Sequence, residues 1–74
     1  MNKFEDKHTK FIRLAEKRVN NAIKSIELIG NLSNKNNYEY SHKDVQKIIK
    51  TLKKSVDNVE YKFNSSSSMT FRLK

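Results

Sequence analysis

The chain reads IRLAEKRVNNAIKSIELI over residues 12–29, and its apolar side chains recur at alternating steps of three and four positions. This heptad pattern is typical of an amphipathic helix that buries one face. We call its six members the N-terminal seam: Ile12, Ala15, Val19, Ala22, Ile26 and Ile29. Phe4 extends the pattern backwards, so a helix is predicted over about residues 3–29. Gly30 follows directly and is predicted to end this helix in a left-handed conformation, with Leu32 folding back on the last turn.

A second helix is predicted after an asparagine-rich loop, NLSNKNNYEY, at residues 31–40. Ser41 and Asp44 have the spacing of a capping box, and Tyr40 is placed to pack on Val45 as a hydrophobic staple. The apolar residues that follow again alternate in steps of four and three, which predicts a helix over 41–63. We call them the C-terminal seam: Val45, Ile49, Leu52, Val56, Val59 and Phe63.

The composition changes at residue 64. Asn64 and the four serines at 65–68 bury no apolar surface, which favours a flexible tail over 64–74 after a helical domain at 1–63. Apolar and polar residues alternate over 69–73, a pattern of period two that fits a short strand added to a partner's sheet edge.

Length and composition together favour an all-α fold. The chain has 74 residues, 35% of them apolar, with no cysteine, no proline and one glycine. These numbers exclude collagenous, turn-rich all-β and glycine-loop phosphate-binding architectures. We expect an antiparallel two-helix hairpin that dimerises into a four-helix bundle, because one hairpin covers each seam on one side only. The alternative is a monomeric hairpin whose tail folds back.

Basic residues are concentrated opposite both seams. Sixteen Lys and Arg against eight Asp and Glu give a formal charge of +8. The basic residues opposite the N-terminal seam are Lys10, Arg13, Lys17 and Lys24, and those opposite the C-terminal seam are Lys47, Lys50 and Lys54. Rows of cations can contact successive phosphates of a nucleic acid, and the excess of Lys over Arg disfavours base-specific recognition. The same rows are also compatible with a solvated or protein-facing surface.

The loop supplies four further candidate contacts. Lys35, Asn36, Asn37 and Tyr38 form a polar, aromatic tip that suits either stacking on unpaired bases or adaptable protein recognition.

No catalytic or metal-binding constellation is evident in the sequence. His8 and His42 are far apart, and no cysteine or paired carboxylate accompanies either of them. The cluster of Glu5, Asp6 and His8 has no second group of ligands to complete a metal site. We therefore expect a non-enzyme without cofactor or small-molecule substrate. No apolar run is long enough to span a bilayer, so we expect no membrane association and a cytoplasmic location.

The segments RVNNAIKSIELIGNLSN, NYEYS and DVQKII lie between residues 18 and 63. They resemble short uncharacterised helical proteins of Gram-positive bacteria and their mobile elements. The resemblance implies an accessory protein and assigns no biochemical activity.

Two functional hypotheses follow from these patterns. The first is a dimeric nucleic-acid-associated regulator that contacts phosphates through its basic residues. The second is a protein-binding module, for example an inhibitor of a defence or host complex, that docks on an acidic or nucleic-acid-binding surface of its partner.

Overall fold

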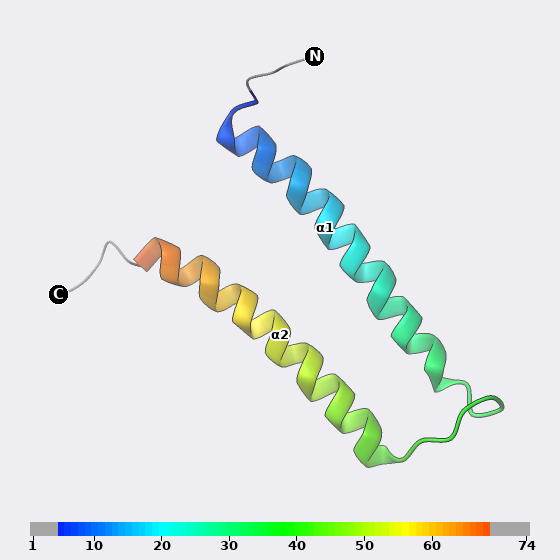
Figure 1. Cartoon of the computed structure of the whole chain (residues 1–74). Helices are drawn as coiled ribbons and strands as arrows, with labels where there is room; N and C mark the ends of the chain where they lie inside the picture. The colour runs from blue at the N-terminus through cyan, green and yellow to red at the C-terminus, as the bar shows by residue number, and fades with distance from the viewer. Residues whose placement is uncertain (1–4, 69–74) are drawn as a thin grey trace. The chain divides into compact units, whose positions relative to one another are not determined.

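The computed structural model describes residues 5–68, with side chains described through residue 65, and all of its regular secondary structure in this range is helical. Helix α1 comprises Lys7–Gly30, a short 3-10 helix η1 comprises Asn31–Ser33, and α2 comprises His42–Ser68 (Figure 1). The predicted all-α class is therefore confirmed. The chain divides between residues 39 and 40 into two units. The predicted strand at 69–73 lies outside the described residues.

Helix α1 begins at Lys7, later than the predicted start near residue 3. Asp6 has extended backbone angles, and its carboxylate accepts a hydrogen bond of 2.7 Å from the backbone N–H of Thr9. The first helical bond then runs from the N–H of Lys10 to the carbonyl of Asp6, at 3.0 Å. Aspartate is a strong N-cap, so this local bond fixes the helix start even though the apolar pattern extends further back.

The end of α1 also differs from the prediction. Gly30 has φ −60° and ψ −30°, which is right-handed helical backbone, and not the left-handed conformation expected of a Schellman ending. The helix tightens into η1, and the backbone N–H of Asn31 reaches the carbonyls of Glu27, Leu28 and Ile29. This N–H caps the last turn of α1, which ends without a left-handed residue at Gly30.

The backbone makes a local turn after Asn34, inside the predicted loop. The side-chain oxygen of Asn34 accepts a hydrogen bond of 3.0 Å from the N–H of Asn36. Its backbone carbonyl accepts from the N–H groups of Asn37, at 3.1 Å, and Tyr38, at 3.0 Å. This is the way in which asparagine stabilises turns, and it confirms the interpretation of this segment as a loop beyond Ser33.

The start of α2 confirms the predicted capping box. The hydroxyl of Ser41 accepts a hydrogen bond of 3.1 Å from the backbone N–H of Asp44, and the Asp44 carboxylate accepts one of 2.8 Å from the backbone N–H of Ser41. Two donors that the first helical turn leaves without partners are thus satisfied reciprocally. Tyr40 is half-buried and lines a shallow depression with Ile48 and Leu52, while its staple contact with Val45 stays a prediction.

Helix α2 continues to Ser68, past the predicted end at residue 63. Phe63 is the last residue of the apolar pattern, but serine costs only about 0.5 kcal/mol relative to alanine in a helix. No glycine or proline follows Phe63, so nothing in the local chemistry interrupts the ladder of backbone hydrogen bonds there.

No member of either seam is buried: Ala15, Ile29 and Leu52 are half-buried, and the other members are exposed. Among the residues whose side chains are described, none is buried. Exposure of the large seam residues includes 42% at Ile12 and 55% at Val19 on α1, and 37% at Val45 and 63% at Val56 on α2. Most helical stability in proteins comes from packing of an apolar face, so these faces are the part of each helix that a partner surface would stabilise.

We predict that Gly30→Ala raises the stability of α1 by about 0.5–1 kcal/mol. Its backbone angles suit an alanine, and a Cβ added there meets no atom within 4 Å. Thermal melts followed by circular dichroism measure the change. A left-handed Gly30 would give the opposite sign, because alanine is strained in that conformation.

We predict that α2 loses helicity in acid, because its capping box depends on the charged carboxylate of Asp44. Hydrogen bonds from Ser41 hold the pKa of the Asp44 carboxyl below its usual value, because they favour the charged form. This stabilisation is complete above the usual pKa of about 4 and is lost as the pH falls through the lowered value. Circular dichroism between about pH 6 and pH 2 should show it as declining helicity.

The matched controls for this prediction are two charge-equivalent variants. Asp44→Asn should reduce the acid transition, whereas Asp57→Asn removes the same charge from α2 without touching the cap and should leave the transition in place. Ser41→Ala should cost about 1 kcal/mol at neutral pH. Equal transitions in both Asn variants would show that the cap does not carry the pH dependence.

Candidate functional site

The predicted cations of α1 share one face of that helix. At about 100° per residue they lie within about 60° of its circumference, opposite the N-terminal seam. All four of these side chains are exposed. We call them the N-terminal basic face: Lys10, Arg13, Lys17 and Lys24. Their spacing along the axis is about 4.5, 6 and 10.5 Å at 1.5 Å per residue.

The predicted cations of α2 are arranged in the same way on their own helix. We call them the C-terminal basic face: Lys47, Lys50 and Lys54. All three are exposed and lie opposite the C-terminal seam, within about 60° of the circumference. Lys50 and Lys54 also line a shallow surface depression together with Lys53 and Asp57. Each helix therefore carries an amphipathic division between an apolar and a cationic face.

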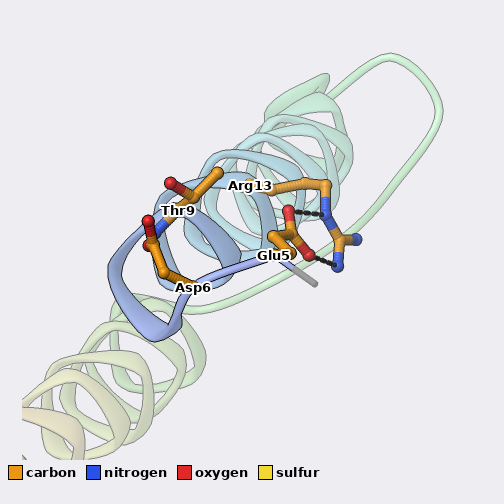
Figure 2. A network of polar contacts seen from close by, with 4 residues as sticks. All are labelled: Glu5, Asp6, Thr9 and Arg13. Carbon is orange, nitrogen blue, oxygen red and sulfur yellow. Dashed lines mark hydrogen bonds and ion pairs between the residues drawn. The ribbon is translucent and has the colours of Figure 1, made fainter. Parts of the chain in front are cut away.

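One member of the N-terminal basic face is already paired (Figure 2). The guanidinium of Arg13 donates two hydrogen bonds to the carboxylate of Glu5, from Nε to Oε2 at 3.0 Å and from a terminal nitrogen to Oε1 at 2.9 Å. Such a bidentate pair matches the planar geometry of both groups. Glu5 therefore competes with any phosphate for Arg13.

Two pKa values reflect this pair. The hydrogen bonds from Arg13 lower the pKa of the Glu5 carboxyl, and the charge of Lys10 adds to the effect. The same hydrogen bonds raise the pKa of Arg13. Both groups are therefore charged at neutral pH, and the ion pair neutralises part of the N-terminal basic face.

Two exposed apolar residues on the basic faces were missed by the sequence interpretation. Leu28 lies four positions after Lys24, and Tyr61 lies seven positions after Lys54, so each continues the direction of its basic face. Their exposed fractions are 67% and 71%. Helical spacing alone would have placed both residues on the basic faces. Neither residue fits the periodicity of a seam, which is the signal that the sequence offers.

The predicted loop contacts are also solvent-exposed. Lys35, Asn36, Asn37 and Tyr38 belong to the same unit as α1, in the turn that follows η1. The backbone of this turn is held by Asn34, and Tyr38 has 47% of its surface accessible. The turn therefore presents these side chains at its surface.

Within residues 5–68 no group of three or more His, Cys, Asp and Glu side chains is arranged to hold a metal ion. Neither α1 nor α2 is long and apolar enough to cross a bilayer, as far as the chain is described. His8 lies in the first turn of α1 and His42 in the first turn of α2, and both are exposed.

Comparison with known proteins adds no further constraint: no family model, curated protein or solved structure matches this chain.

We predict that Glu5→Gln strengthens binding of this protein to a polyanion. Loss of the carboxylate charge weakens the bidentate pair and makes the Arg13 guanidinium available. Elution from a heparin column should move to higher salt. Glu27→Gln is the control, since it changes net charge equally at the far end of α1, and an equal shift in both variants would show that net charge alone is responsible.

Proposed function

We propose that this protein is a small non-enzymatic regulator that self-associates through its seams and binds nucleic acid through its basic faces. The observation that carries the proposal is the division of each helix into an exposed apolar seam and an opposite exposed row of cations. Burying the seams leaves both rows of cations at the surface. Self-association and phosphate binding are therefore compatible on the same helices.

A second copy of the chain is the proposed cover for the seams. Heptad spacing suits knobs-into-holes packing of long helices, and Ala15 and Ala22 share one heptad position where small side chains permit close approach. We propose an antiparallel hairpin that pairs into a four-helix bundle with α1 at its centre.

Phosphates are the proposed ligands of the basic faces. Lysine ammonium groups bind phosphate as point charges and release counterions from the nucleic acid, which provides affinity without reading bases. Arg13, the one arginine of the two basic faces, is held by Glu5. Binding of weak sequence specificity is the expected result.

A bulky substitution in the N-terminal seam tests the assembly. Ala22→Phe should disrupt close helix packing at a cost of roughly 1–3 kcal/mol and shift the protein towards monomer. Sedimentation equilibrium at micromolar concentration measures the mass, for which a monomer is 8.8 kDa. An 8.8 kDa species for the unaltered chain would refute the bundle, and unchanged association in the variant would place Ala22 outside the interface.

The salt dependence of binding tests the nucleic-acid function. Affinity for a duplex should fall steeply with salt, with a log–log slope of about −0.9 per phosphate contact. Replacing Lys17 and Lys24 together by Gln should reduce the slope by about two contacts, equally for unrelated sequences. Fluorescence anisotropy measures the affinities, and circular dichroism checks that helicity is kept. Absence of binding at about 50 mM salt would refute this function and leave the protein-binding alternative.

A further inference from the structure

Tyr61 has the largest exposed fraction, 71%, among the described large apolar side chains. At about 100° per residue it lies within the arc that Lys47, Lys50 and Lys54 occupy, on the side of α2 opposite the C-terminal seam. Burial of that seam by a second copy would therefore leave Tyr61 accessible. Its ring lies outside the apolar face and is accessible to a ligand.

An aromatic ring among cations is suited to an unpaired nucleic-acid strand. Such a strand offers phosphates to lysines and the flat faces of its bases to aromatic rings, whereas a duplex covers those faces by its own stacking. We propose that the C-terminal basic face and Tyr61 together bind single-stranded nucleic acid, with Lys50 and Lys54 on phosphates and the Tyr61 ring stacked on a base. This inference rests on the proposed nucleic-acid function and adds a preference for unpaired strands.

The spacing along α2 fits this division of roles. Lys50 and Lys54 are about 6 Å apart along the helix axis, and Tyr61 lies about 10.5 Å beyond Lys54. The ring thus follows the cations in line along the helix. Asp57 lies one turn before Tyr61 and weakens the positive potential there, so the base face of a nucleotide, and not its phosphate, is the group favoured beside the ring.

The corresponding position on α1 supplies an internal comparison. Leu28 follows Lys24 on the N-terminal basic face and is 67% exposed, but its side chain has no π-face to stack on a base. We therefore assign the strand preference to α2. Tyr38 in the loop is the other exposed tyrosine to be distinguished, with 47% of its surface accessible.

The experiment compares a thymidine oligonucleotide of about 20 nucleotides with a duplex of the same length at about 50 mM salt. Fluorescence anisotropy gives the affinities of Tyr61→Leu, Tyr61→Phe and the control Tyr38→Leu. We expect Tyr61→Leu to weaken binding to the oligonucleotide about five-fold or more, and duplex binding less than two-fold. Tyr61→Phe keeps the ring and should retain the affinity. Intrinsic tyrosine emission, unobscured because the chain has no tryptophan, should be quenched by the oligonucleotide less in Tyr61→Leu.

The outcomes separate the two proposals. Tight duplex and oligonucleotide binding that Tyr61→Leu leaves unchanged overturns the strand preference while the proposed function stands. A loss in Tyr38→Leu equal to or greater than that in Tyr61→Leu also overturns it, because stacking would then not be specific to α2. Absence of binding to either nucleic acid overturns the proposed function and this inference together. Circular dichroism of every variant excludes loss of helix as the cause.

Discussion

Apolar side chains face solvent along both α1 and α2, and their burial is the constraint on which the rest of this protein depends. Helices of this length gain most of their stability from packing, since the backbone hydrogen bonds alone leave an isolated helix marginal in water. The local bonds at Asp6 and at Ser41 fix where the helices begin, but they bury no apolar area. In the proposed function a second copy covers the seams, which would leave the basic side of each helix for a ligand.

The start of α2 was predictable from sequence because both halves of its capping box are visible as side chains three positions apart. The end of α1 was predicted to within one residue, but the start of α1, the backbone conformation of Gly30 and the end of α2 were not. The apolar pattern continues to Phe4, which conceals the N-cap that Asp6 provides, and Gly30 accepts either handedness at little cost. Phe63 ends the apolar pattern but not the helix, because serines tolerate helical backbone. The periodicity of the apolar residues thus locates the faces of a helix more accurately than the residues at which the helix begins and ends.

Only part of the candidate site could be predicted from the sequence. The angular position of each predicted cation follows from helical geometry, so the two basic faces could be derived from residue numbers alone. The pairing of Arg13 with Glu5 could not be derived in this way. Glu5 precedes the helix, and the extended backbone before Lys7 sets the direction of the Glu5 side chain. Tyr61 could be placed on its face from its residue number, but an aromatic residue on a polar face belongs neither to the apolar periodicity nor to the charge pattern.

The hydrogen bonds described above that involve side chains join residues two to eight positions apart. Each helix therefore needs none of the other's residues for its caps and turns. During synthesis from the N-terminus, α1 and its clasp between Glu5 and Arg13 can begin to form before Ser41 has been added to the chain. Helix formation takes about 0.1–1 µs, far less than the addition of one residue at about 5–20 per second. The division of α1 into an apolar and a basic face can therefore be set by local interactions alone.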